Sequence, residues 1–497
     1  MSTIVDSDTN GWPLQPKSVR ASFGLTGTEA LLLPLVLGAG LVLLTATLQV
    51  ALVNTLGLFL VVVLIGLWRC RATTIRLADT KLRVLGTLWL IKLSLTLFLL
   101  YTGWMPQLDP ALSDSWGYDP QRYYQDAYDL IETGWNVTQS TNYQGIIFYY
   151  GALFYLFGHN PVIPALINAF VTLLGTLFLI RVAYELKTLR GPRDWTLAYL
   201  LLIPEIVWYD VMTGRETLVA VLVLVSTLSI GQYLVGPVKM PFLRTALIGG
   251  ACLVALLAVR TSMAIPVVVS VVMMGLFLPS EKRLIVAPKL LFIALVFGLL
   301  ALGPLVQTMI GGYDIEYISL LLQAQSFEAN VAAEMEWSDN SIGLLLAPNN
   351  AFEFILFLVP RAILYLVAPL PNIAIPITDL LDGSYVAWQR LLTIPTSLMM
   401  IGALPYALAG FSLALKQRKK RPAPLVLYIS FWVTLAAIAG GNIIIHERYR
   451  VMMTLLLFAC AWLGYTSCTK QHIRRYAILW YVVLTSAAVF YMIYKQL

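Results

Sequence analysis

Long apolar stretches recur along almost the whole chain, and they constrain its fold more than any other feature. Each is about 18 residues or longer, which is enough to cross the hydrocarbon core of a bilayer. Of the 497 residues, 59% are hydrophobic and 12% are charged, whereas a soluble domain carries roughly a quarter charged residues. The sequence therefore predicts an all-α polytopic membrane protein.

The apolar stretches predict about thirteen membrane crossings. These are 29–48, 50–68, 84–102, 161–183, 195–210, 216–234, 244–259, 262–278, 289–309, 391–415, 424–442, 449–468 and 474–494. Two further apolar segments, 144–157 and 352–370, do not fit as crossings, because counting either one would move basic loops to the outer side. We expect both segments to lie on the outer interface as amphipathic or re-entrant helices.

The distribution of charge predicts the orientation of these helices. Basic residues concentrate in short loops, such as the run 416–421, and an excess of Lys and Arg in short loops marks the cytoplasmic side. The longer loops 102–143 and 311–350 are acidic, so we expect them to face outward. The net charge of +7 then follows from membrane topology and does not indicate nucleic-acid binding. The polar start, 1–28, predicts a cytoplasmic tail and not a signal peptide.

The first outer loop contains a helix start that carries a carboxylate. Asp119 precedes Pro120, and Asp suits the N-cap while Pro suits the first helical position, where its missing N–H costs nothing. The helix should run to about Thr133 and end at Gly134, a residue that suits a helix C-terminus. Asp119 either only caps this helix or also serves as a general base, and these two interpretations do not exclude each other.

Arginines stand at several predicted helix ends on the outer side. Arg215 and Glu216 lie between two crossings, Arg260 interrupts an apolar sequence, and Arg361 lies in the interfacial segment. The structural alternatives are an ion pair at a helix end or a side chain that snorkels to the surface, but charges at membrane depth usually face a cavity or a partner. A last polar cluster opens a late crossing, where anchoring is the alternative. It consists of His446, Glu447, Arg448, Tyr449 and Arg450.

These residue types predict a site for an anionic lipid phosphate beside a proton acceptor. Guanidinium groups bind phosphate oxygens through two parallel hydrogen bonds, and a nearby Asp can take the proton of an attacking sugar hydroxyl. The chain has no glycine-rich phosphate loop, and its outer loops carry no DxD metal motif. We therefore expect a polyprenyl phosphate, and not a nucleotide, as the leaving group. Asp109 and Asp114 stay open as alternative bases.

The order of several short motifs resembles the GT-C glycosyltransferases, especially bacterial relatives of the protein mannosyltransferases (glycosyltransferase family 39) and of the aminoarabinose lipid A transferase. The resemblance extends from about residue 84 to residue 470 and rests on the order of the motifs, each of which is short. The motifs are Asp119-x-x-Arg122-Tyr123-x-x-x-Ala127, Leu156-Phe157-Gly158, Ala165-Leu166-Ile167-Asn168, Arg215-Glu216, Pro360-Arg361-Ala362-Ile363-Leu364-Tyr365 with Pro369-Leu370-Pro371, and Glu447-Arg448-Tyr449-Arg450.

The resemblance implies an inverting hexosyl- or pentosyltransferase of the bacterial inner membrane, with its active site on the periplasmic side. The donor would be a polyprenyl-phosphate-linked sugar and the acceptor a lipid, glycan or protein; membrane lipids surround the chain and no nucleic acid takes part. Asp119 becomes the catalytic base. No cofactor or metal ligand is expected, and the use of a divalent cation stays open. Substrate binding is assigned to Arg122, Tyr123, Arg215, Glu216, Arg260, Arg361, His446, Glu447, Arg448, Tyr449 and Arg450.

The resemblance also predicts a domain organisation. It gives a cytoplasmic tail (1–28), an extra transmembrane hairpin (29–68), and a GT-C-like catalytic body (84–497) with outer loops at 102–160 and 311–390. The chain departs from the family at 143–145, where Tyr-Gln-Gly replaces the frequent Pro-Pro or His-Pro.

Two alternatives stay open. The first is a cell-surface polysaccharide polymerase or ligase, whose arginine-rich outer mouth would look similar. The second is a flippase or transporter for a lipid-linked sugar, for which an inverted repeat and broken helices are expected.

Overall fold

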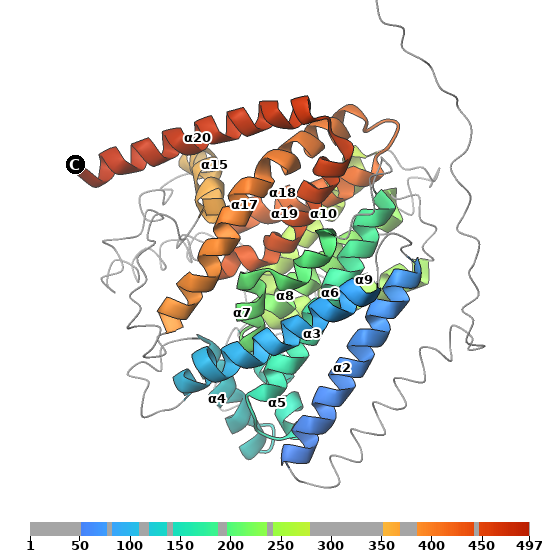
Figure 1. Cartoon of the computed structure of the whole chain (residues 1–497), viewed down its shortest axis with the longest axis vertical. Helices are drawn as coiled ribbons and strands as arrows, with labels where there is room; N and C mark the ends of the chain where they lie inside the picture. The colour runs from blue at the N-terminus through green and yellow to red at the C-terminus, as the bar shows by residue number, and fades with distance from the viewer. Residues whose placement is uncertain are drawn as a thin grey trace, which may run out of the picture.

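The computed structural model describes residues 51–76, 82–108, 119–136, 143–186, 196–235, 242–278, 351–367, 385–441 and 447–496 (Figure 1). All regular elements within these ranges are helical, and none of the ranges contains a strand. The all-α class predicted from the sequence is confirmed for this part of the chain. The predicted crossings 29–48 and 289–309, the tail 1–28 and the acidic loop 311–350 lie outside the described residues.

Eight helical stretches in the described ranges are long and apolar enough to cross a membrane. They are Asn54–Thr74, Val84–Trp104, Val162–Leu186, Glu216–Leu234, Leu247–Gly275, Ala387–Lys416, Ala423–Gly440 and Arg448–Ser467. Seven of these stretches each correspond to one predicted crossing, and Leu247–Gly275 covers the two predicted at 244–259 and 262–278, so the multi-pass architecture is confirmed. The predicted crossing 474–494, which lies in the helix Lys470–Gln496, is not among these eight stretches.

The helices named below have the following bounds. They are α2 (Ala51–Arg76), α3 (Leu82–Leu99), α4 (Asp119–Glu132), α5 (Gln144–Phe157), α6 (Val162–Leu186), η3 (Thr196–Leu202), α7 (Pro204–Val211), α8 (Glu216–Val235), α9 (Phe242–Arg260), η4 (Thr261–Met263), α10 (Ala264–Phe277), α15 (Ala351–Val367), α17 (Tyr385–Lys416), α18 (Ala423–Gly441), α19 (Glu447–Ser467) and α20 (Lys470–Gln496).

The crossing predicted at 195–210 is not one continuous α-helix. It consists of the 3-10 helix η3 followed by the short α7, with the break at Ile203 and Pro204. Ile203 has an extended backbone (φ −62°, ψ 118°), as expected for a residue that precedes proline. Pro204 then starts a new helix, where its fixed φ is suitable and its missing N–H is not needed. This stretch is not among the eight candidate spans.

The candidate span Leu247–Gly275 contains a reversal of the chain. Gly249 of α9 packs against Ile230 of α8, and Met274 of α10 packs against Gly231 of α8. Both ends of the stretch therefore reach the same level of α8, and the chain turns back at η4 between them. The two separate crossings predicted for this region are both helical, and they are packed on α8 as a pair.

The helices α17 and α19 cross with their backbones in contact. A Cβ atom at Gly464 would collide with the carbonyl oxygen of Tyr406, and one at Gly410 would lie 2.7 Å from the Cα of Gly464. Small residues allow such close approach between helices in a membrane. The Tyr428 hydroxyl of α18 donates to the Cys460 carbonyl at 3.1 Å beside this crossing, so three helices are locked together there.

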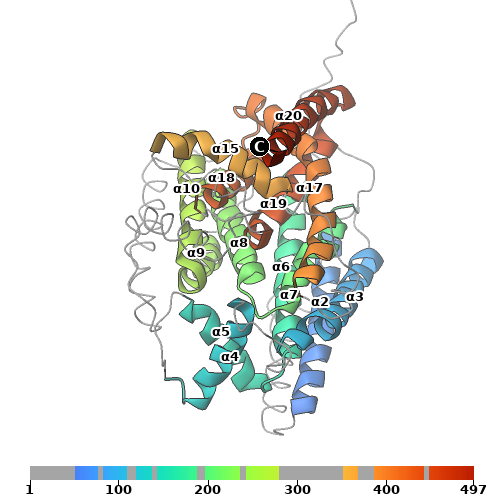
Figure 2. The same ribbon diagram turned by 90° about the vertical axis from the view of Figure 1, so that its left-hand side faces the viewer.

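Two short apolar helices do not count as crossings, as predicted, but they lie at opposite ends of the molecule. Figure 2 shows α4 and α5 at one end of the bundle and α15, with α20, near the other. The prediction that 352–370 shares the outer face with α5 is therefore corrected. The charge of the neighbouring loops suggested that placement, whereas α15 packs against α18 and α17 and buries Arg361 and Tyr365.

Candidate active site

Side chains from four helix ends meet beside α4 and form what we call the arginine cluster. α4 contributes its first residues, α8 begins at the cluster, α9 ends there, and α19 begins there. The members are Asp119, Tyr123, Arg215, Glu216, Arg260, Arg448 and Tyr449. The sequence analysis named all seven as site residues, and the structure brings them together.

Asp119 and Arg448 form the central ion pair of the cluster. Arg448 Nη1 donates to Asp119 Oδ2 at 2.8 Å across a sequence separation of 329 residues. The same guanidinium donates from Nη2 to the Tyr449 hydroxyl at 3.0 Å. The two charged side chains are 33% and 28% exposed, so the pair is open to the outside at one edge and a substrate can reach the carboxylate.

The helix that begins at Asp119 ends as the sequence predicted. α4 stops at Glu132, and Gly134 adopts a left-handed backbone (φ +65°), which glycine adopts without steric cost. The amide of Trp135 then donates to the Leu130 carbonyl at 2.8 Å. The bounds of α4 therefore fix Asp119 at the first turn, next to α19.

Tyr449 holds two guanidinium groups against its ring. Arg260 lies 4.8 Å and Arg448 lies 4.9 Å from the ring centroid. A cation over an aromatic face is attracted by the ring quadrupole, by about 2 kcal/mol where water is excluded. Tyr449 thus helps to hold two like charges close together, and the Glu216 carboxylate attracts both of them.

Arg215 Nε and Arg260 Nη1 are buried nitrogen atoms of the cluster that have no hydrogen-bond partner within the described part of the chain. Arg215 instead lies over the ring of Tyr123, 5.8 Å from its centroid, and Arg260 is 8% exposed. A buried donor that lacks an acceptor costs about 1–3 kcal/mol. An anion with several acceptor oxygens would remove that cost.

The charges of the cluster leave it positive. Three guanidinium groups face the two carboxylates of Asp119 and Glu216, which gives a net charge of 3 − 2 = +1. Burial raises the pKa of the Asp119 carboxyl, but Arg448 and Arg215, with a smaller effect of Arg122, lower it by more, so the pKa lies below its ordinary value. Asp119 is therefore ionised at neutral pH.

A short loop before α8 is held by three side chains that the sequence analysis did not assign to the site. The Tyr150 hydroxyl donates to the Gly214 carbonyl at 2.5 Å, and Asn168 Nδ2 donates to the Met212 carbonyl at 2.9 Å. The Thr213 hydroxyl donates to the Pro120 carbonyl at 2.5 Å. These bonds join α5, α6 and α4 to the residues that precede Arg215. The signal for Asn168 was an amide within an apolar crossing.

Gly145 allows the start of α5 to pack close to the end of α9, next to the arginine cluster. A Cβ atom at Gly145 would collide with the carbonyl group of Ala258, two residues before Arg260. The start of α5 therefore packs directly on the backbone of α9. A glycine at this position therefore allows the contact between α5 and the end of α9.

Arg450 was predicted to bind the donor phosphate, but the structure places it elsewhere. Its Nε lies 3.0 Å from each carboxylate oxygen of Glu205, and its Nη1 donates to Ser397 Oγ at 2.7 Å. Nη2 donates to the Thr393 carbonyl at 3.0 Å, and the side chains of Arg450 and Glu205 are fully buried. Residues two positions apart on a helix point about 200° apart, so Arg450 faces α7 and α17 while Arg448 faces Asp119.

The remaining predicted residues take different places. Arg122 is exposed and lies over the ring of Tyr143 at 5.8 Å, at the rim of the cluster. Arg361 belongs to α15 near the other end of the bundle (Figure 2), so it does not join the cluster. Glu447 begins α19, and His446 lies outside the described residues. Within the described ranges, no three His, Cys, Asp or Glu side chains are grouped as metal ligands.

Besides Arg450 and Glu205, a second ion pair is buried beside α7, and the sequence analysis did not predict it. Lys92 Nζ lies 2.5 Å from Asp210 Oδ2, both side chains are fully buried, and Thr172 donates to the same carboxylate oxygen at 3.0 Å. Together with Glu205, Asp210 gives the short α7 two buried acids, each paired with a base from another helix. These charges connect α7 to α3 and α19.

The chain was compared with protein-family models, with curated proteins and with solved structures, and no match was found in any of the three.

Proposed function

We propose that the arginine cluster transfers a sugar from a polyprenyl-phosphate donor to an acceptor hydroxyl at the outer face of the membrane. The observation that carries the proposal is the ionised Asp119 beside three guanidinium groups, of which Arg215 and Arg260 have buried nitrogen atoms without a hydrogen-bond partner among the described residues. A carboxylate accepts a proton, and free guanidinium donors stabilise a phosphate leaving group.

In this mechanism Arg215 and Arg260 bind the oxygens of the donor phosphate. Their partnerless Nε and Nη1 atoms are the available donors. The acceptor hydroxyl attacks the anomeric carbon, and Asp119 Oδ takes the hydroxyl proton. The new bond joins the anomeric carbon to the acceptor oxygen, and the bond from that carbon to the phosphate oxygen breaks. The electron pair stays on the phosphate, where the arginines compensate the charge, and a single displacement inverts the anomeric centre.

The Asp119–Arg448 pair fits the first step. Arg448 holds the carboxylate at the edge of the cluster through one oxygen, Oδ2. No hydrogen bond from another described side chain is shown to Oδ1, which can therefore face the acceptor. When the phosphate binds, Arg448 can also donate to it, because a guanidinium carries five N–H donors.

The test is transfer of a radiolabelled sugar from a panel of polyprenyl-phosphate donors by the purified protein in liposomes. The wild type is compared with Asp119→Asn and with Asp126→Asn, a control carboxylate seven residues further along α4. We expect label to reach an acceptor or water with the wild type and with Asp126→Asn. Loss of a positioned general base should slow Asp119→Asn by about 10²–10⁴-fold, with donor binding retained.

The other outcomes distinguish the alternatives. Equal turnover by the wild type and Asp119→Asn removes Asp119 from the mechanism and favours a polymerase or ligase that depends less on a carboxylate base. Binding of a lipid-linked sugar with no turnover of any donor overturns the transferase proposal. That result favours a flippase, for which the break between η3 and α7 is the relevant feature.

A further inference from the structure

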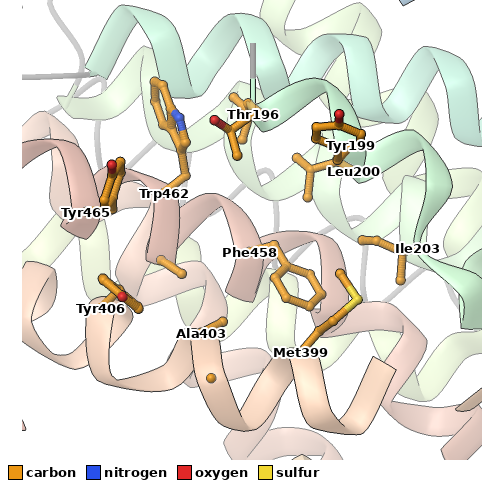
Figure 3. Close-up of a pocket in the computed structure, with 13 residues that line it drawn as sticks. Thr196, Tyr199, Leu200, Ile203, Met399, Ala403, Tyr406, Phe458, Trp462 and Tyr465 are labelled. Carbon is orange, nitrogen blue, oxygen red and sulfur yellow. The ribbon is translucent and has the colours of Figure 1, made fainter. Parts of the chain in front are cut away.

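An apolar groove lies between η3, α17 and α19 (Figure 3), and its α19 residues follow Arg448 of the arginine cluster by ten or more positions. It encloses about 440 Å³, within the range of about 300–1,000 Å³ typical of sites for small molecules. Thr196 and Leu200 form its η3 side, Ala403 and Tyr406 its α17 side, and Phe458 and Trp462 its α19 side. The groove is thus built from three separate parts of the chain.

The groove has a polar end and an apolar end. Figure 3 shows Thr196, Trp462 and Tyr465 gathered toward one end, and Ile203, Met399 and Phe458, together with Tyr199, toward the other. Tyr465 is 60% exposed and Met399 is 43% exposed, so the groove opens along its length to the flank of the bundle. Tyr and Trp at one end of an apolar surface are typical of the level of lipid head groups.

Basic side chains lie on α20, which packs on α17 near the level of the polar end of the groove. A ring nitrogen of His472 on α20 lies 3.2 Å from the Ala409 carbonyl oxygen, three residues beyond the groove residue Tyr406. The first turns of α20 therefore reach this level of α17, and they carry the exposed side chains of Lys470, Arg474 and Arg475. The sequence placed these bases on the cytoplasmic side of the membrane.

A second basic feature lies further along the same end. The turn between α17 and α18 surrounds a hollow lined by five basic residues. They are Lys416, Arg418, Lys419, Lys420 and Arg421. This turn adds positive charge to the surface around the groove, but it is ten or more residues beyond Tyr406, or about 15 Å along a helix. The bases of α20 are at the level of the groove, and those of the turn are beyond it.

We propose that the groove binds one acyl chain of an anionic phospholipid from the cytoplasmic leaflet. The chain lies on the apolar end at Met399 and Phe458, the glycerol region lies at Thr196 and Tyr465, and the phosphate meets Arg474 and Arg475. The apolar lining, the aromatic end and the positive charge at the same level match the three parts of such a lipid in order. This site is separate from the arginine cluster, and it does not depend on the proposed transferase activity.

Two glycines give a matched pair of variants that test the chain site. A Cβ atom at Gly402, which lines the groove, or at Gly250 on α9 would meet nothing within 4 Å. Gly402→Leu therefore adds a side chain to the groove wall from a Cβ position that is open, and Gly250→Leu adds the same side chain elsewhere. Both replacements favour the helix, so neither should unfold the protein.

The measurement is native mass spectrometry of the purified protein after reconstitution in nanodiscs of equal amounts of phosphatidylglycerol and phosphatidylcholine. We expect the wild type and Gly250→Leu to retain more phosphatidylglycerol than phosphatidylcholine. Gly402→Leu should retain it roughly tenfold less, as should Arg474→Gln combined with Arg475→Gln. Neutralising Lys419 and Lys420 of the turn to Gln, an equal change of charge, should have a much smaller effect.

Several results would overturn the proposal. Unchanged retention in Gly402→Leu removes the groove as the chain site, and equal retention of the two lipids removes the head-group selectivity. Equal losses from the α20 pair and the turn pair show a diffuse surface charge and no defined site. A dimer of the chain that disappears in Gly402→Leu, or a polyprenyl lipid retained in place of the phospholipid, assigns the groove to another occupant.

Discussion

Arg448 and Arg450 stand two positions apart on α19 and bind carboxylates from different parts of the molecule. Arg448 donates to Asp119 at the open edge of the arginine cluster, and Arg450 binds Glu205 in the interior. The first pair is partly exposed and the second is fully buried. The buried pair therefore fixes the start of α19 against α7 and α17, and the exposed pair takes its position from it.

Breaking the buried pair should destabilise the protein. Arg450→Met removes the guanidinium that pairs with the buried Glu205 carboxylate, and the loss of one member of a buried pair costs about 3–5 kcal/mol. We expect a large fall in the apparent melting temperature in detergent. The control is Arg181→Met, which breaks the partly exposed Arg181–Glu185 pair at 2.9 Å and should change stability by less than about 1 kcal/mol.

A double variant shows whether the lost stability comes from the unbalanced charge of Glu205 or from the other hydrogen bonds of Arg450. Arg450→Met combined with Glu205→Leu removes both charges, so most of the lost stability should return. If the double variant is as unstable as Arg450→Met, the hydrogen bonds of Arg450 to Ser397 and to the Thr393 carbonyl are the important ones.

Replacing Arg260 by Lys should weaken donor binding while the positive charge remains. Lys cannot present the planar pair of donors that a phosphate accepts, and one charged hydrogen bond is worth about 1.5–3 kcal/mol, or roughly tenfold to a hundredfold in affinity. KM for the polyprenyl-phosphate donor should rise accordingly. Arg122→Lys, at the exposed rim over Tyr143, should change KM much less. An equal effect of both variants would place the phosphate at the rim.

The activity should depend on pH through Asp119. Its pKa is lowered, because Arg448 and Arg215 outweigh the effect of burial, so activity on acidification should fall only below the ordinary carboxyl pKa of about 3.9. Arg448→Gln removes the largest of the lowering effects and leaves the burial, so the acidic limb of the rate profile should move to higher pH. Rates measured between about pH 2.5 and 8, which include the acidic limb of the wild type, decide this. Identical acidic limbs in the two proteins would exclude Asp119 as the titrating group.

The contribution of Asp119 to folding stability should also fall on acidification, as the activity does. A carboxyl with a pKa lowered by folding stabilises the folded state above its unfolded pKa. That contribution is lost as the pH falls through the folded value, and Asp119→Asn should remove this part of the pH dependence.

Enlarging Gly464 should separate α17 from α19. A Cβ atom there would collide with the Tyr406 carbonyl, and backbone atoms cannot move aside as a side-chain end can, so Gly464→Ala should cost about 1–3 kcal/mol. The midpoint of thermal unfolding and the yield of folded protein measure this. Gly402→Ala, whose Cβ meets nothing within 4 Å, is the control. Equal stability of the two variants would contradict the close crossing.

The sequence predicted the helical class and most helix positions, because apolar length is a local property. The stop of α4 at Gly134 was predictable for the same reason: left-handed backbone favours glycine. The break at Ile203 and Pro204 was not predicted, because the hydropathy around it stays high. The placement of α15 was wrong, since the charge of neighbouring loops gives no information about which helix face packs on α18.

The members of the arginine cluster were predicted one by one, but their contacts were not. Asp119 and Arg448 are far apart in sequence, and nothing local indicates that they meet. Arg450 has the same residue type as Arg448 and a neighbouring position, so only the three-dimensional structure separates a structural arginine from one at the site. Tyr150 and Lys92 were passed over because each lies within an apolar segment and has no motif around it.

Three of the four helices that meet at the arginine cluster point their amino ends toward it. α4 begins at Asp119, α8 begins at Glu216 and α19 begins at Glu447. The aligned peptide dipoles place roughly half a positive charge at each such end. An anion at this place is therefore attracted by the backbone as well as by side chains, and part of that attraction would remain after any single arginine is replaced.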